Sequence, residues 1–210
     1  MTMKVSFLRI TALVLLHLLV FSFGTVTTFA YSTSGYSWSS SPIPYYINSA
    51  FASSFRTAMK AADATWDAAG ADFSFSCGST ACTTSANPNV WSYSCDLEKS
   101  IGYYNRGDTG VLAAVNFCAV GSSLAEADTT LNTYYSFTTT GAAGKYDVQD
   151  LVTHEFGHWL WLLDLSSSGS PSYCSSSVMS TMCRYMYPGQ TYRRSLRTDD
   201  KDGIKAIYGT

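Results

Sequence analysis

The sequence predicts an α+β domain in which a twisted β-sheet lies beside one central helix. Short segments with alternating apolar residues indicate several strands, and three segments have the features of helices. No internal repeat and no stretch of linker-like composition divides the chain. It has 210 residues, of which 46% are hydrophobic and 15% aromatic, enough for one domain with a substantial core.

Residues 1–30 have the features of a secretory signal peptide. Lys4 and Arg9 precede an apolar run from Ile10 to Phe23, and the small residue Ala30 stands at a plausible cleavage site. The run is short for a membrane span, so a retained anchor is the weaker alternative. We therefore expect a secreted, extracellular product, residues 31–210, with no stable membrane association after cleavage.

The net charge and the cysteine content indicate which partners are disfavoured and which state the cysteines take. Without Lys4 and Arg9, the 13 basic residues become 11 against 15 acidic ones, a net charge near −4. Such a charge argues against nucleic acid or an anionic membrane as the partner. Six cysteines in an exported chain favour disulfides over zinc ligation, since no C-x-x-C pair exists. Many connectivities are open; we predict the local pairs Cys77–Cys82, Cys95–Cys118 and Cys174–Cys183.

The first half of the product is expected to contain two strands around a helix. Residues 31–41 form an extended leader, and a first strand follows with Ile43, Tyr45 and Ile47 in alternation. The next segment has apolar residues at helical spacing, a capping residue at Asn48 or Ser49 and a stop at Gly70. Its apolar residues are Phe51, Phe55, Met59, Ala62 and Trp66. Phe73, Phe75 and Cys77 alternate as a second strand.

The second half is expected to contain two more strands and two helices. Residues 78–100 have no clear period and are predicted to form a surface excursion. Strands follow over residues 110–120 and 125–137. Asp147 is placed to cap a helix over residues 148–163. A Ser-rich loop over residues 165–177 comes next, and a closing helix begins at Thr198 and ends at Gly209.

The central helix carries the pattern His154-Glu155-Phe156-Gly157-His158. Histidines four residues apart project from one helix face and can bind a single ion. Zinc suits them, because it accepts imidazole nitrogen in tetrahedral geometry and keeps a position for water. The only other histidine, His17, lies in the predicted signal peptide, which disfavours an ordinary polar or core role for this pair. The opposite stripe is predicted to face the core: Val148, Val152, Phe156, Trp159 and Leu163.

A zinc site of this kind needs a third protein ligand. No glutamate follows Glu155, whereas Asp164 stands ten residues after His154 and offers a carboxylate. An unbroken helix would carry Asp164 about 9 Å along its axis beyond His158, so the chain must turn near residue 161. Two alternatives stay open. Asp164 makes only local hydrogen bonds, or the third ligand is Asp199 or Asp200.

Several of these segments resemble the metzincin zinc peptidases, nearest to matrixin-like catalytic domains and their secreted bacterial relatives. The resemblance is carried by HEFGHWLWLLD and by the ending TMCRYMYPGQTYRRSLRTDDKDGIKAIYG. More weakly, GVLAAVNF resembles the strand that borders the substrate cleft, and LAEADTTLN the strand after it. Snapalysin-type metzincins also place aspartate at the third ligand position. The sequence departs from the pattern at Trp161, where the family has glycine and the chain turns.

This resemblance implies a metzincin-like zincin fold. Its parts are a twisted, mostly parallel sheet with an edge strand bordering the cleft, an active-site helix, a Met-turn and a C-terminal helix. It implies the zinc ligands His154, His158 and Asp164, with Glu155 activating the zinc-bound water. Met182 best matches the methionine beneath the metal, and Met179 is the second choice.

The implied function is a secreted zinc-dependent endopeptidase that acts, as a monomer, on peptide or protein substrates. Leu112, Ala113, Ala114 and Val115 are expected to pair with the substrate backbone, and Tyr185 to line the pocket beside the cleaved bond. Calcium is an uncertain second cofactor, because Asp108, Glu126 and Asp128 lie where matrixins hold ions. The alternative function is a catalytically inactive, zinc-stabilised extracellular binding protein on the same fold, which the presence of Glu155 disfavours.

Overall fold

The computed structural model describes residues 31–33, 35–88, 95–165, 174–175 and 178–210. The predicted signal peptide and most of the predicted Ser-rich loop lie outside these residues. The described part contains three α-helices, α1 (Ser53–Asp67), α2 (Val148–Trp159) and α3 (Thr198–Tyr208), and the 3-10 helix η1 (Tyr192–Arg194). None of these helices is long and apolar enough to span a membrane.

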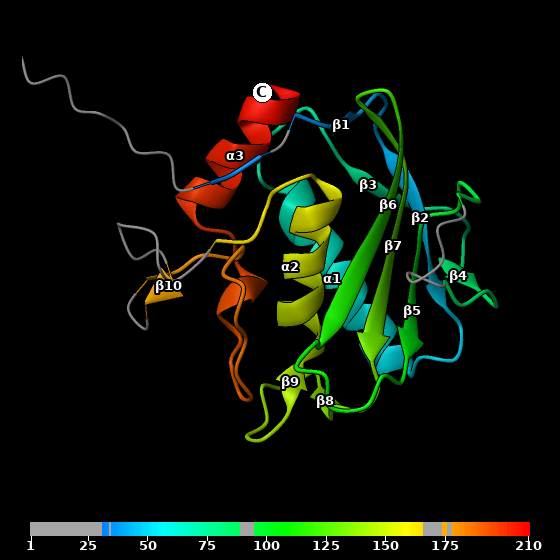
Figure 1. Ribbon diagram of the computed structural model, residues 1–210, viewed down its shortest axis with the longest axis vertical. Helices are drawn as coiled ribbons and strands as arrows, with labels where there is room; N and C mark the ends of the chain where they lie inside the picture. The colour runs from blue at the N-terminus through cyan, green and yellow to red at the C-terminus, as the bar shows by residue number, and fades with distance from the viewer. Residues whose placement is uncertain (1–30, 34, 89–94, 166–173, 176–177) are drawn as a thin grey trace, which may run out of the picture.

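A seven-stranded sheet forms one layer of the molecule (Figure 1). Its strands are β1 (Ser37–Trp38), β2 (Ile43–Asn48), β3 (Phe75–Cys77), β4 (Thr83–Thr84), β5 (Ser100–Tyr104), β6 (Ala113–Val120) and β7 (Ser123–Asn132). The order is β1-β7-β5-β2-β3, with β4 also paired to β2 and β6 to β7. Only the β6–β7 pair is antiparallel. The mixed, mostly parallel sheet predicted from the sequence is therefore present.

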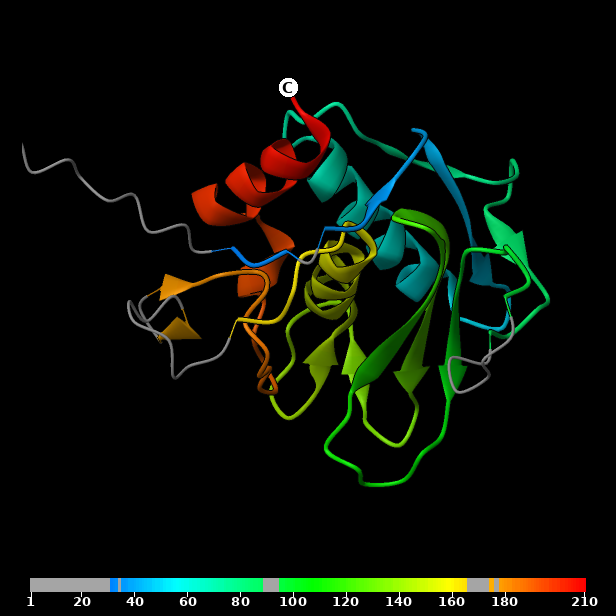
Figure 2. The same ribbon diagram turned by 45° about the horizontal axis from the view of Figure 1, so that its top comes forward.

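Helices α1 and α2 pack against each other and against this sheet, and α2 also faces the C-terminal part of the chain (Figures 1 and 2). Aromatic rings fill the space between them. Phe156 of α2 lies 4.5 Å from Phe75 and 5.4 Å from Tyr45, measured between ring centroids. Such edge and tilted contacts add to the apolar burial that holds the two layers together.

Three tryptophans fix the helices by hydrogen bonds as well as by packing. Trp66 of α1 donates to the carbonyl of Thr153 at 2.8 Å, and Trp159 of α2 donates to the hydroxyl of Thr129 on β7 at 2.8 Å. Trp38 of β1 donates to the carbonyl of Trp159 at 2.7 Å. Each buried indole N–H is thereby satisfied, as burial in an apolar core requires.

The helix predicted over residues 148–163 is shorter in the structure. It ends at Trp159, and Leu163, predicted to lie in the core stripe, is 38% exposed. The reason is that the chain reverses at Trp161, so residues beyond it no longer follow the helical face. The predicted turn near residue 161 is confirmed.

The strand predictions were incomplete in the middle of the chain. Strand β5, which lies between β2 and β7, was not predicted, and β4 lies inside the predicted excursion of residues 78–100. The predicted leader contains β1. The predicted strand over residues 125–137 ends at Asn132, and a separate short pair follows, β8 (Phe137–Thr138) with β9 (Tyr146–Asp147). A second short pair is β10 (Cys174–Ser175) with β11 (Val178–Met179).

All three predicted disulfides are confirmed, and each joins cysteines that are neighbours in the sequence. Their Cα–Cα distances are 4.7 Å for Cys77–Cys82, 5.7 Å for Cys95–Cys118 and 5.5 Å for Cys174–Cys183. The second bond ties the edge strand β6 to the segment that precedes β5, and the third ties β10 to the segment that follows β11.

Removing the disulfide Cys95–Cys118 should lower the free energy of unfolding more than removing the disulfide Cys77–Cys82. Cys95 and Cys118 are 23 residues apart, whereas Cys77 and Cys82 are only 5 apart. Loop-closure entropy gives losses of about 3 and about 2 kcal/mol in the free energy of unfolding, respectively. Urea unfolding of the two double Cys→Ser variants measures both; equal losses would contradict a chain-entropy origin.

Candidate metal centre and cleft

Helix α2 is held at its first turn by carboxylates that arginines neutralise. Asp147 caps the helix, as predicted, by accepting a hydrogen bond from the N–H of Asp150 at 3.1 Å. Arg194 donates to Asp147 at 2.9 Å through Nε. Burial raises the pKa of Asp150, and its ion pair with Arg193 at 3.2 Å counteracts that rise. The arginines were not predicted, because η1 has no periodic signal.

In His154 and in His158, a hydrogen bond at one ring nitrogen, Nδ1, fixes the direction in which the second ring nitrogen, Nε2, points. Nδ1 of His154 lies 2.8 Å from the carbonyl oxygen of Thr181, and Nδ1 of His158 lies 2.8 Å from that of Leu162. A carbonyl can only accept, so Nδ1–H is the donor in both rings, and Nε2 is the nitrogen left to face a metal ion. Two imidazoles prepared in this way are typical metal ligands.

The helix ends in a Schellman motif that redirects the chain toward the histidines. The N–H of Leu162 donates to the carbonyl of Gly157 at 3.0 Å, and the N–H of Trp161 to that of His158 at 2.8 Å. Trp161 occupies the left-handed position of this motif, with φ 67°. Glycine is usual there, and a residue with a Cβ costs roughly 1–2 kcal/mol.

Asp164 follows this turn and lies against both histidines. Its Oδ1 is 3.4 Å from Nε2 of His154 and 3.6 Å from Nε2 of His158. Burial works to raise the pKa of Asp164, but the two histidines together lower it well below its ordinary value. Asp164 thus lies beside the two predicted histidine ligands. Its contacts are not limited to the local hydrogen bonds that the alternative role would require.

The two separations that involve Asp164 fit a tetrahedral ion. Zinc bonds of about 2.0–2.2 Å at tetrahedral angles place neighbouring ligand atoms roughly 3.3–3.6 Å apart. The two separations involving Asp164 are 3.4 and 3.6 Å, and the ligand atoms of all three residues lie within 4.8 Å of one another. Two nitrogens and one carboxylate oxygen match the ligand types that zinc takes in sites with an open fourth position.

Asp164 is anchored on both sides by backbone hydrogen bonds. On one side, the N–H of Leu163 donates to the carbonyl of Ser32 at 2.8 Å. On the other, the N–H of Leu165 donates to the carbonyl of Met182 at 2.7 Å. Arg184 adds a charge contact, with Nε 4.0 Å from Oδ2 of Asp164. The carboxylate is therefore held in place by its chain neighbours as well as by the histidines.

Met182 packs on Gly157, which lies between the two histidines in the sequence. A Cβ added at Gly157 would overlap Sδ of Met182 and would lie 3.0 Å from Cζ2 of Trp66. Met182 is 2% exposed, and its neighbour Thr181 supplies the carbonyl for His154. The residue proposed for the Met-turn is thus in contact with the helix between the two histidines, whereas Met179 lies in β11.

The two aspartates considered as an alternative third ligand lie elsewhere. The hydroxyl of Ser180 donates to Asp199 at 2.7 Å and to Asp200 at 2.8 Å, and Asp200 also accepts from the N–H of Thr181 at 3.2 Å. These carboxylates begin α3 and hold the segment that carries Met182. The alternative third-ligand hypothesis is therefore not supported by their positions.

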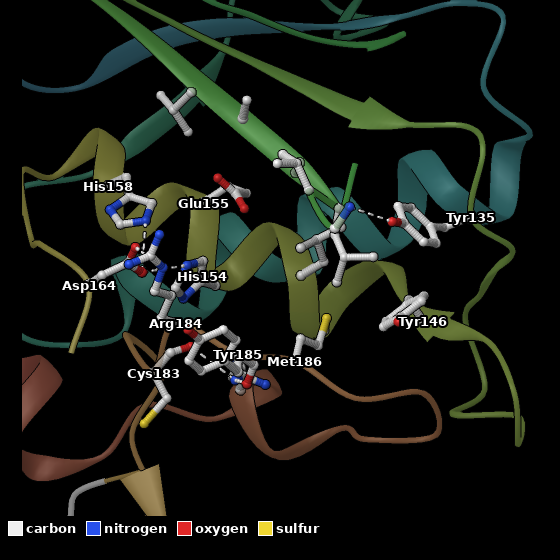
Figure 3. A pocket seen from close by; sticks show the side chains of 18 of the residues that line it. Tyr135, Tyr146, His154, Glu155, His158, Asp164, Cys183, Arg184, Tyr185 and Met186 are labelled. Atoms are coloured by element: carbon white, nitrogen blue, oxygen red, sulfur yellow. Dashed lines mark hydrogen bonds and ion pairs between the residues drawn. The ribbon is translucent and has the colours of Figure 1, made fainter. Parts of the chain in front are cut away.

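A cavity of about 610 Å³ opens in front of the histidines (Figure 3). Glu155 projects into it beside the His154–His158–Asp164 group (Figure 3). The side chain is 6% exposed, and burial raises its pKa, although the neighbouring histidines act in the opposite direction. A carboxylate with a raised pKa, next to a metal site, is suited to accept a proton from water and release it again.

One wall of the cavity is the beginning of strand β6. All the predicted substrate-binding residues line the cavity: Leu112, Ala113, Ala114, Val115 and Tyr185. Strand β6 pairs with β7 on one side, and no strand in the described part of the chain pairs with its other edge. Tyr135 and Tyr146 close the far end of the cavity (Figure 3).

The carboxylates considered for calcium are only partly together. Glu126 and Asp128 share a cluster with Asp96, in which ligand oxygens lie within 4.8 Å of one another. Asp108 is not in this cluster; it accepts a hydrogen bond from Tyr135 at 2.8 Å. Burial raises the pKa of Asp128 to about 7. Calcium binding by Asp108, Glu126 and Asp128 stays an untested prediction, and the structure groups the last two with Asp96 rather than with Asp108.

Sequence comparison does not assign the chain to a family. No protein-family model and no curated protein matches it. Among solved structures it is similar to high choriolytic enzyme 1, a hatching enzyme zinc-protease from the medaka fish Oryzias latipes. The identity is 14% and the TM-score 0.45, over 84% of this chain and 96% of that chain. This likeness is too weak to assign a family or an activity.

The contact between Gly157 and Met182 gives a direct test of the packing under the histidines. Gly157→Ala should lower the free energy of unfolding by about 1–3 kcal/mol, because the added methyl group overlaps Met182 Sδ. In a Met182→Ala background the same substitution should cost much less, because the overlap is removed. Thermal unfolding of the four variants of this cycle gives both values, and additive losses would argue against this packing.

Proposed function

We propose that this protein is a zinc-dependent endopeptidase of the metzincin type. The observation that carries the proposal is the convergence of Nε2 of His154, Nε2 of His158 and Oδ1 of Asp164 on one side of a cavity that also holds Glu155. The donor set and spacing fit zinc. The matrixin-like subtype rests on the sequence resemblance alone.

Each residue of the site has a distinct role in this proposal. A zinc ion held there would lower the pKa of a water molecule toward 7 and polarise a substrate carbonyl. Glu155 takes the proton of the attacking water and passes it to the leaving amine. The Thr181 and Leu162 carbonyls keep the two histidines in the tautomer that binds metal.

The substrate in this proposal is an extended peptide that pairs with the free edge of β6. Backbone hydrogen bonds along Leu112–Val115 would hold it antiparallel or parallel to the strand, so binding would depend little on sequence. Side chains would then be selected by the cavity wall, to which Tyr185 contributes with 59% of its surface exposed. Residues 1–30 act as a signal peptide, and residues 31–210 are the secreted, monomeric catalytic domain.

Replacing Glu155 should abolish cleavage and leave metal binding intact. Glu155→Gln keeps the size of the side chain but cannot accept the proton, so the rate should fall roughly 10²–10⁴-fold. The assay is cleavage of an unfolded protein by purified residues 31–210, with and without a chelator, and Glu98→Gln serves as the matched control. A zinc-loaded Glu155→Gln protein that cleaves at the wild-type rate would falsify the role of Glu155. A zinc-loaded wild type that cleaves nothing would favour the inactive binding protein.

The ligand set can be tested by zinc retention. Asp164→Ala should lose bound zinc on dialysis, because one of three protein ligands is removed. Asp199→Asn should retain zinc, since Asp199 bonds Ser180 rather than the histidines. Metal analysis after dialysis against a weak chelator measures both variants. The reverse result, loss only in Asp199→Asn, would move the third ligand to α3.

A further inference from the structure

The position of Asp164, the proposed third ligand, depends on the backbone conformation of Trp161. That conformation is unfavourable for a residue with a side chain as large as tryptophan. Trp161, three residues before Asp164, has φ 67° in a position where glycine is usual. The Schellman hydrogen bonds at Leu162 and Trp161 need this conformation, and they direct the chain toward the histidines. Some other contact must therefore compensate for the strain at Trp161.

The indole of Trp161 contacts two aromatic rings. The ring centroid of Tyr36 is 4.7 Å away with planes at 52°, and that of Phe117 is 4.6 Å away with planes at 71°. Phe117 belongs to β6, whereas Tyr36 comes from the N-terminal segment before β1. These contacts are made with Trp161 in its left-handed conformation, so they contribute to the stability of that conformation.

The same N-terminal segment contacts the chain on both sides of Trp161. The carbonyl of Ser32 accepts from the N–H of Leu163 at 2.8 Å, and Thr33 forms an antiparallel bridge with Leu162. On the other side, Trp38 donates to the carbonyl of Trp159 at 2.7 Å. Figures 1 and 2 both show this segment, in blue, passing the C-terminal end of α2.

Helix α3 packs closely on the turn after α2 and on the N-terminal segment at Gly203. A Cβ at Gly203 would lie 2.9 Å from Cδ2 of Leu162 and 2.9 Å from Cβ of Tyr31. Leu162 is fully buried at this place. The turn after α2 therefore contacts the N-terminal segment, β6 and α3, while its Leu162 carbonyl and the Asp164 carboxylate reach the histidines.

We propose that Ser32, Thr33, Tyr36 and Trp38 form an N-terminal clamp that holds the Trp161 turn and so positions Asp164 for the metal. The inference rests on the proposed function, because it takes Asp164 to be a zinc ligand. Tyr36 is a positioning residue: it acts through Trp161 and does not itself touch the ion. The clamp makes metal affinity depend on residues that directly follow the predicted signal peptide.

The test is the zinc affinity of Tyr36→Ala, measured by competition with a chromophoric chelator. Tyr36 is 36% exposed, so the variant is expected to fold, and circular dichroism checks this. Loss of a group that orients a metal ligand typically weakens binding 10–100-fold, and we expect about a tenfold loss here. Tyr36→Phe keeps the ring and should bind zinc as the wild type does. Tyr104→Ala, at an exposed tyrosine of β5, controls for the loss of a surface aromatic.

A Trp161→Gly background separates positioning from general stability. Glycine adopts φ 67° without strain, so in this background Tyr36→Ala should change zinc affinity less than about threefold. Hydrogen exchange of the Leu162 and Leu163 amides in the metal-free protein adds a readout that needs neither zinc nor cleavage. Tyr36→Ala should speed this exchange when Trp161 is present.

The outcomes distinguish this inference from the proposed function. Unchanged zinc affinity in Tyr36→Ala, or an equal loss in both backgrounds, would overturn the clamp even if the enzyme cleaves protein. A background-dependent loss with accelerated amide exchange would support the clamp even if the zinc-loaded wild type cleaves nothing. A wild type that binds no zinc would overturn both.

Discussion

The burial of helix α2 is the constraint on which the rest of the structure depends. Ten of its twelve residues are buried, although the helix carries one aspartate, two histidines and a glutamate and is capped by a second aspartate, Asp147. Buried polar groups are tolerated only when hydrogen-bonded or paired, so the surrounding chain must supply a partner for each. Residues 180–194 provide most of them: the Thr181 carbonyl for His154, Arg193 for Asp150 and Arg194 for Asp147.

This constraint explains the order of elements after the helix. The chain must reverse to bring Asp164 back to the histidines, pass beneath the helix with Met182 against Gly157, and return with two arginines at the first turn. Asp199 and Asp200 then fix the segment beneath the helix through Ser180. Residues 180–194 thus satisfy or position groups on α2 and at its cap, and strand β6 packs against the helix as well.

The sequence was sufficient for the parts of the site that share one helix or one short segment. The spacing of His154 and His158, the cap at Asp147 and the turn required before Asp164 all follow from helical geometry. Local cysteine pairs were predictable for the same reason, because they are close along the chain. The closing helix, Thr198 to Tyr208 with Gly209 beyond it, was marked by its ends.

What the sequence did not indicate depends on contacts between distant segments. Strand β5 has the sequence SIGYY, with no alternation, and it is a strand because β2 and β7 flank it. Arg193 was not predicted because its partner Asp150 lies 43 residues earlier. Trp161 is unfavourable by local geometry at this position, and its contacts with the rings of Tyr36 and Phe117 come from distant segments.

The bulge in β6 has a consequence for how the protein behaves in solution. An open strand edge can pair with any extended chain, which makes long, flat edges prone to aggregation. Between Cys118 and Ala119 the register of β6 with β7 shifts, and the Cys95–Cys118 disulfide lies at that point. Bulges twist a strand away from flat pairing. The edge available to another chain is thereby shortened to Ala113–Cys118, and this part of β6 begins at the wall of the cavity.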